Sequence, residues 1–209
     1  MNDALNSRVG PPKTVAVIGA GLIGCSWASL FAACGMNVRV YDARPEAGRY
    51  LAEFWENVRP TLDQLGYEFA TGTAPRFVVC NTAEEAVVGA ALVQECIPER
   101  LTLKQELYAE IEPALAPGTI VATSSSGLRL SDLQALWADP SRLIIAHPFN
   151  PPHLIPLVEL FGNDRTASDI LPLARAFYEA CGKVTITLKR EVPAHGGRKR
   201  DQRRCLLHD

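Results

Sequence analysis

His147 is the residue of this sequence best suited to proton transfer. It ends the apolar run 143–146, and an imidazole titrates near neutral pH, so it can accept or donate a proton. Glu159 follows twelve residues later and could orient the ring if the intervening loop doubles back. Two plainer interpretations stay open. His147 could be an ordinary histidine with a satisfied hydrogen bond, and the residues alone favour Glu159 as a strand-end carboxylate that faces water.

The other candidates for chemistry are weaker. Ser126 is the last of three consecutive serines after a strand-like segment, and a serine-rich turn or helix cap is the alternative. His153 lies in a loop flanked by prolines, where we expect it to be exposed. His195 and His208 lie at the edge of the C-terminal tail and within it.

A glycine pattern near the N-terminus predicts a nucleotide site. Gly19, Gly21 and Gly24 follow the apolar strand-like run 15–18 in the spacing G-x-G-x-x-G. In such a turn the first glycine allows a tight bend, the second lets the backbone approach a pyrophosphate, and the third lets a helix pack on the strand. The helix that we expect from Leu22 would point its first N–H groups at that phosphate. The alternative is a glycine-rich turn in another α/β protein.

Asp42 ends the next predicted strand, eighteen residues after Gly24. A carboxylate at this place can accept both hydroxyls of an adenosine ribose and would repel a 2′-phosphate. The sequence therefore predicts NAD as the cofactor rather than NADP. Arg44, two residues further on, is the feature that could still admit NADP.

Strands alternate with helices along the chain, which predicts an α/β fold of the Rossmann type with a doubly wound, mostly parallel sheet. We expect helices over 45–65 and 131–137, a short helix capped by Asn81 or Thr82, and one that follows Glu99 and runs to about Leu115. A further helix is expected from Thr166 or Ser168 to Cys181. Strands are expected over 15–18, 38–41, 76–80, 91–94, 119–122, 142–146, 157–160 and 184–188. Polar clusters follow several of these strands, at the edge where such sheets bind ligands.

Composition excludes several other classes of protein. The 209 residues are 47% hydrophobic and 21% charged, with a formal net charge of −2, so nothing indicates nucleic acid or membrane as a partner. No apolar run is long enough to span a bilayer, and residues 1–13 lack the apolar core of a signal peptide. The six cysteines show no C-x-x-C pair or metal-ligand spacing, so we expect no metal site and a reducing, cytoplasmic setting.

Four motifs in this order, VIGAGLIG, QECIPERLTLK, ATSSSGL and AHPFNPPHLIPLVEL, resemble the 3-hydroxyacyl-CoA dehydrogenase superfamily over residues 14–195. The resemblance implies that His147 is the general base, that Glu159 pairs with it, and that Ser126 bonds the reacting oxygen or the cofactor. It implies a small-molecule 3-hydroxy acid or acyl-CoA substrate and a homodimer in the full-length family. The residues that it implies for NAD contacts are Gly19, Gly21, Leu22, Ile23, Gly24, Asp42, Glu99, Lys104 and Asn150.

Within the superfamily the sequence resembles the branch of lambda-crystallin-like L-gulonate 3-dehydrogenases and L-carnitine dehydrogenases. The Ser-Ser-Ser-Gly-Leu run and Pro148 after the histidine carry this resemblance. It favours a small polar 3-hydroxy acid over an acyl-CoA.

The resemblance stops after His195, where the family continues into a helical domain. Here a basic run begins that holds Arg198, Lys199, Arg200, Arg203 and Arg204. Such a run usually is a solvated, disordered end, and a nucleic-acid or membrane patch is the less favoured interpretation. We therefore expect an N-terminal extension (1–13), an NAD-binding domain (14–190) and a linker remnant with a tail (191–209). The second helical domain is expected to be missing, through a truncated or frame-shifted gene, and the alternative function is a catalytically inactive NAD-binding domain.

Overall fold

Strand β1 (Thr14–Ile18) lies inside an eight-stranded sheet in the computed structural model, which describes residues 13–67 and 77–190. The other strands are β2 (Asn37–Tyr41), β3 (Phe77–Val79), β4 (Leu92–Glu95), β5 (Ile120–Thr123), β6 (Leu143–Pro148), β7 (Leu157–Phe161) and β8 (Val184–Thr187). Their order across the sheet is β3-β2-β1-β4-β5-β6-β7-β8. Neighbouring strands are parallel throughout except for β6 and β7, which are antiparallel. The prediction of a mostly parallel sheet is confirmed.

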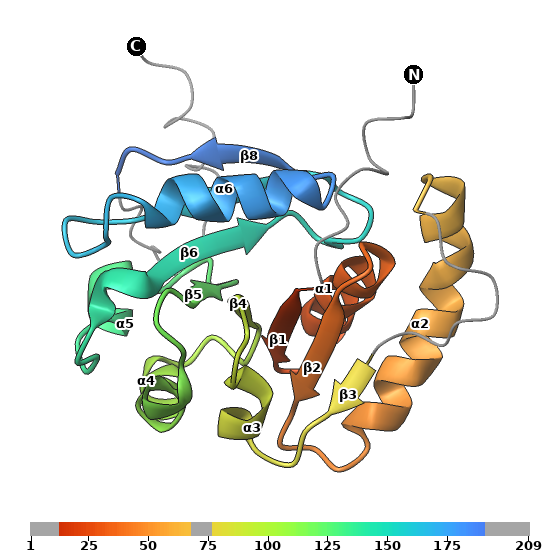
Figure 1. Cartoon of the computed structure of the whole chain (residues 1–209), viewed down its shortest axis with the longest axis horizontal. Coiled ribbons are helices and arrows are strands. Elements are labelled where there is room, and N and C mark those ends of the chain that lie inside the picture. Colours follow the sequence, from red (N-terminus) through yellow and green to blue (C-terminus); the bar gives the residue numbers. More distant parts are fainter. Residues whose placement is uncertain (1–12, 68–76, 191–209) are drawn as a thin grey trace.

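Helices cover both faces of this sheet (Figure 1). Val15 and Val17 of β1 pack with α1 (Leu22–Ala33), α2 (Ala47–Gln64) and α6 (Ile170–Ala180). Ala16 and Ile18 point to the other face, because successive side chains of a strand alternate. That face packs against α3 (Ala83–Val87), α4 (Leu101–Ile111) and α5 (Leu130–Leu133). Two 3₁₀ helices, η1 (Glu112–Ala114) and η2 (Pro140–Arg142), complete the described elements.

The order of the strands changes direction at β1. The chain runs from β1 through β2 to β3 on one side of β1, and then crosses to β4 on the other side. In open α/β sheets, ligands bind beyond the carboxyl ends of the strands at such a switch point. The residues that follow β1, β2 and β4 therefore line the expected ligand edge.

β6 and β7 are antiparallel because no helix connects them. Only the loop 149–156 lies between the two strands, and a parallel connection needs a longer crossover. β6 continues two residues beyond its predicted end and therefore contains His147. The helix predicted over 131–137 is shorter, Leu130–Leu133, and the one predicted from Thr166 or Ser168 begins at Ile170.

Several sequence predictions fall partly or wholly outside the described residues. The N-terminal extension lies there except for Lys13, and the linker remnant and basic tail over 191–209 lie there entirely. Inside the described part, the expected cap of α3 is confirmed: the Thr82 hydroxyl accepts a hydrogen bond from the Glu85 N–H at 3.1 Å.

Candidate active site

The glycine turn after β1 has no space for side chains where it packs on its neighbours. Gly19 has φ of +97°, and a Cβ there would lie 2.8 Å from the carbonyl carbon of Cys96. A Cβ on Gly24 would lie 1.7 Å from the Gly19 carbonyl oxygen, so α1 packs directly on the turn. A Cβ on Gly21, by contrast, would meet nothing within 4 Å. Gly21 therefore borders open space at the start of α1.

This start of α1 fits an anionic group. Gly21 is the N-cap residue and gives the helix no side-chain hydrogen bond, and Leu22 beside it is 52% exposed. The first N–H groups of a helix have no acceptor within the helix, and its dipole favours negative charge at this end. The open space over Gly21 and these donors fit the pyrophosphate of a dinucleotide.

Asp42, just beyond β2, is joined to the glycine turn. Its Oδ2 accepts a hydrogen bond from the Ala20 N–H at 2.6 Å. Arg44 donates two hydrogen bonds to Oδ1, from its backbone N–H and from its Nε, both at 2.9 Å. Its Nη2 donates a third, to Oδ2, at 3.0 Å. Burial alone would raise the pKa of Asp42, but these hydrogen bonds and the charge of Arg44 outweigh it and lower that pKa. A carboxylate thus stands at the predicted ribose position.

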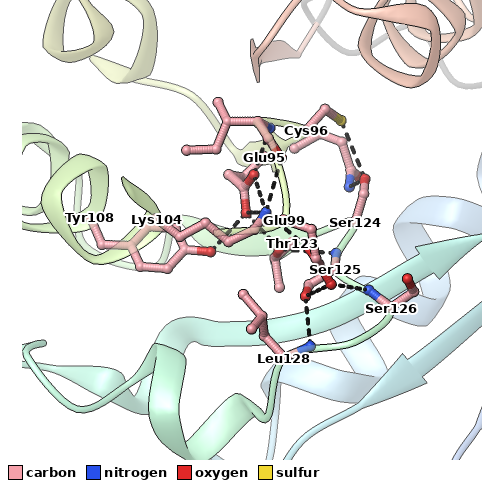
Figure 2. Close-up of polar contacts among 12 residues, drawn as sticks. Glu95, Cys96, Glu99, Lys104, Tyr108, Thr123, Ser124, Ser125, Ser126 and Leu128 are labelled. Atoms are coloured by element: carbon pink, nitrogen blue, oxygen red, sulfur yellow. Dashed lines mark hydrogen bonds and ion pairs between the residues drawn. The ribbon is translucent and has the colours of Figure 1, made fainter. Parts of the chain in front are cut away.

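A buried charge network lies at the carboxyl end of β4 (Figure 2). The Glu95 carboxylate is fully buried and accepts hydrogen bonds from Lys104 Nζ at 2.6 and 2.8 Å. It also accepts from the Tyr108 hydroxyl at 2.8 Å and the Thr123 hydroxyl at 2.6 Å. The Ile97 N–H gives a further bond at 2.7 Å. Burial and the Glu95 charge raise the pKa of Tyr108 well above its usual value, so the phenol stays a donor.

Glu99 connects this network to the loop 124–127, which contains the three consecutive serines (Figure 2). Its Oε1 accepts hydrogen bonds from the Ser125 hydroxyl at 2.7 Å, the Ser126 N–H at 2.9 Å and the Gly127 N–H at 2.7 Å. Its Oε2 lies 3.7 Å from Lys104 Nζ. Burial would raise the pKa of Glu99, but these donors and the lysine charge lower it. The ionised carboxylate fixes the loop that carries Ser126, whose own side chain is at an exposed position.

His147 and Glu159 face each other across the antiparallel pair β6–β7. They are register partners, and His147 Nδ1 lies 3.1 Å from Glu159 Oε2. The side chains are 24% and 10% exposed, so the pair is accessible without being fully solvated. A carboxylate in contact with Nδ1 orients the ring and leaves Nε2 as the nitrogen for a substrate.

The loop after His147 is anchored to α1 and to Lys183, which precedes β8. The Ser26 hydroxyl contacts His153 Nδ1 at 2.7 Å and accepts a hydrogen bond from the His153 N–H at 2.9 Å. Lys183 Nζ donates to the carbonyls of Pro152 and, at 3.0 Å, Ile155. The prediction that His153 is exposed was wrong: it is 8% exposed, because its ring packs against α1 and α2. Asn150, at the start of this loop, is exposed.

The structure thus joins the predicted residues in three groups. Asp42 is bonded to the glycine turn, Glu99 to Ser126, and His147 to Glu159. Leu22 and Ile23 lie in the open first turn of α1. Lys104 is 1% exposed and turned toward Glu95, so its expected contact with the cofactor stays a prediction.

Several residues that hold these groups in place had no predicted role. Glu95 ends a buried strand nine residues before Lys104, and this acid–base spacing was the available signal. Tyr108 and Thr123 show no comparable signal, because they meet Glu95 from a helix and another strand. The same is true of Ser26 and His153, which are 127 residues apart.

The fold and the glycine turn define an NAD-binding domain of the Rossmann type. The chain belongs to the family described as 3-hydroxyacyl-CoA dehydrogenase, NAD binding domain, whose model matches residues 14–192. This confirms the predicted family and NAD as its cofactor.

Curated relatives and solved structures agree with this assignment. An L-carnitine dehydrogenase of Streptomyces coelicolor is 45% identical over 181 residues, which are 87% of this chain and 57% of that protein. A solved NAD⁺-dependent 5-formyl-3-hydroxy-2-methylpyridine 4-carboxylic acid 5-dehydrogenase is 30% identical with a TM-score of 0.80 over 88% of this chain and 59% of its own. The 3-hydroxybutyryl-CoA dehydrogenase of Escherichia coli is 26% identical with a TM-score of 0.73, over 85% of this chain and 38% of its own.

The chain spans little more than half the length of the first of these relatives. None of the helices formed by residues 13–67 and 77–190 has the length and apolar character needed to cross a membrane.

Proposed function

We propose that this chain provides the NAD-binding and proton-transfer residues of a dehydrogenase that oxidises the C3 hydroxyl of a 3-hydroxy acid. The observation that supports the proposal most directly is the contact of His147 Nδ1 with Glu159 Oε2 at 3.1 Å, on the carboxyl side of the sheet. A histidine held by a carboxylate is suited to take a hydroxyl proton near neutral pH.

NAD, when bound, supplies the acceptor for the hydride that leaves C3. His147 takes the hydroxyl proton through Nε2, so that the C3 carbon becomes a ketone. Glu159 keeps the ring in place and stabilises the imidazolium that results. Ser126 and Asn150 are both exposed. Ser126 bonds the reacting oxygen or the cofactor, and Asn150 contacts the nicotinamide or the substrate.

A small polar 3-hydroxy acid is the proposed substrate class. Two relatives at 45% identity are named L-carnitine dehydrogenases, and L-carnitine is a 3-hydroxy acid. An acyl-CoA thioester is the alternative, because a structural neighbour at 26% identity is named a 3-hydroxybutyryl-CoA dehydrogenase.

The second candidate function is NAD binding without turnover. Phe149, Leu154 and Ile155, in the loop that follows His147, are 40%, 43% and 38% exposed. Exposed apolar side chains beside a substrate position favour an incomplete pocket in the isolated chain.

One assay distinguishes these functions. The purified chain 1–209 is mixed with NAD⁺ and with L-carnitine, gulonate or 3-hydroxybutyryl-CoA, and NADH formation is followed by absorbance. Oxidation of either small acid, reduced by about a hundredfold or more in His147→Gln, supports the proposal. Turnover of the thioester alone contradicts the substrate class, and saturable NADH binding without any turnover supports the second candidate.

A further inference from the structure

All the hydrogen-bonding positions of the Asp42 carboxylate are occupied within this chain. An ionised carboxylate offers about four lone-pair sites, two on each oxygen. Oδ1 accepts from the backbone N–H and the Nε of Arg44, and Oδ2 accepts from the Ala20 N–H and the Nη2 of Arg44. A ribose cannot donate to this carboxylate while all four bonds persist.

The four bonds fall into two kinds. Two come from the backbone N–H groups of Ala20 and Arg44, in the segments that follow β1 and β2. The other two come from the side chain of Arg44, which is 49% exposed and has one further bond, from Nη2 to the Ala20 carbonyl at 3.0 Å. The two donors of the Arg44 side chain can move away from the Asp42 carboxylate. The two hydroxyl groups of a ribose can then donate to it in their place.

We propose that the Arg44 side chain is a displaceable occupant of the ribose position and a specificity-determining group for the nucleotide. The inference rests on the proposed function, because it requires NAD to bind at the glycine turn. Displacing Arg44 weakens NAD binding. The same guanidinium lies where a 2′-phosphate would arrive and can donate to it, so Arg44 also reduces the discrimination against NADP.

Charge supports this two-sided role. The hydrogen bonds of Arg44 lower the pKa of Asp42, so the pair is ionised at neutral pH and its charges cancel. Without Arg44 the carboxylate would be free to accept the hydroxyls, and its negative charge would face a 2′-phosphate alone.

The test is a fluorescence titration of the chain 1–209 with NADH and, separately, NADPH. Arg44→Ala should tighten NADH binding about twofold to fivefold, which is the size expected when a half-exposed ion pair need not be broken. It should weaken NADPH binding about tenfold, the loss of one charge-assisted contact to a phosphate. Arg44→Lys keeps the positive charge without the two-point contact, so it should tighten NADH binding and retain NADPH binding.

Arg49→Ala is the matched control. Arg49 lies on α2, is 78% exposed and only approaches Glu53 at 4.0 Å, so its removal should change neither affinity. If the wild type binds NADH and Arg44→Ala prefers NADH over NADPH no more strongly than the wild type does, the inference is overturned. The proposed function then still stands. If folded wild-type protein binds neither nucleotide, the proposed function fails and the inference with it.

Discussion

His147 and Glu159 are direct partners in the register of β6 and β7, and their side chains meet at 3.1 Å. Twelve residues of sequence separation become one contact because the loop 149–156 reverses the chain. The antiparallel pairing places both side chains on the same face of the sheet, since register partners share a face.

Replacing His147 by glutamine should reduce turnover by about a hundredfold to ten-thousandfold, the usual contribution of a general base. NADH affinity should hardly change, because the side chain contacts Glu159 and not the glycine turn. Steady-state kinetics and NADH titration measure the two effects. Normal turnover in this variant would falsify the assignment.

Glu159→Gln should also lower turnover, because a neutral amide stabilises the imidazolium less well than a carboxylate does. Its matched control is Glu179→Gln, at the exposed end of α6, where the carboxylate accepts a hydrogen bond from the Thr185 hydroxyl. We expect the control to retain wild-type rates, and equal losses in both variants would argue against a special role for Glu159.

Lys104→Met should destabilise the protein strongly. It leaves the fully buried Glu95 carboxylate without its cation, and breaking a buried pair from one side costs about 3–5 kcal/mol. Urea unfolding measures this loss. The double variant Glu95→Gln, Lys104→Met should recover part of it, because the uncompensated charge is then gone.

The exposed pair of Arg49 and Glu53 provides the comparison for Lys104. Arg49→Met should change the free energy of unfolding by less than about 1 kcal/mol. A Lys104 variant as stable as this control would show that the Glu95 network does not depend on its ion pair.

Lys183 should make stability increase with pH in alkaline solution. Burial lowers its pKa from 10.5 to about 8 in the folded state. Between these values the unfolded chain binds the proton and the folded chain does not, so the free energy of unfolding rises with pH. Below about pH 8 both states hold the proton and this contribution is constant.

The measurement is the difference in unfolding free energy between wild type and Lys183→Met from pH 7 to 10. It should grow by at most about 1.4 kcal/mol per pH unit above pH 8, the value for one proton. Lys189→Met, at an exposed position, should show no such growth relative to wild type. A flat difference for Lys183 would mean that its ammonium is not disfavoured by burial.

Gly21→Ala and Gly24→Ala should separate binding from folding. The Cβ at position 21 meets nothing within 4 Å, so that variant should keep its melting temperature and lose NADH affinity. The Cβ at position 24 would lie 1.7 Å from a backbone oxygen, so that variant should be destabilised by about 1–3 kcal/mol or more. Thermal unfolding and NADH titration test both, and equal melting temperatures would contradict the packing described at Gly24.

Local patterns were sufficient to predict much of the fold. The glycine spacing, the buried strand that precedes it and the acid after the next strand all depend on neighbours within one βαβ unit. Apolar periodicity likewise indicated the helices and strands, although their ends moved by a few residues where caps and loops decide the boundary.

The sequence by itself determined the NAD-binding class, the mostly parallel sheet and the candidates His147 and Glu159. Only the tertiary structure decided which side chains those candidates meet. Glu95 gathers donors from β5 and α4, and His153 is buried against Ser26 from α1, because the strand order brings distant segments to one edge. These contacts depend on three-dimensional packing and not on spacing along the chain, so no local pattern could specify them.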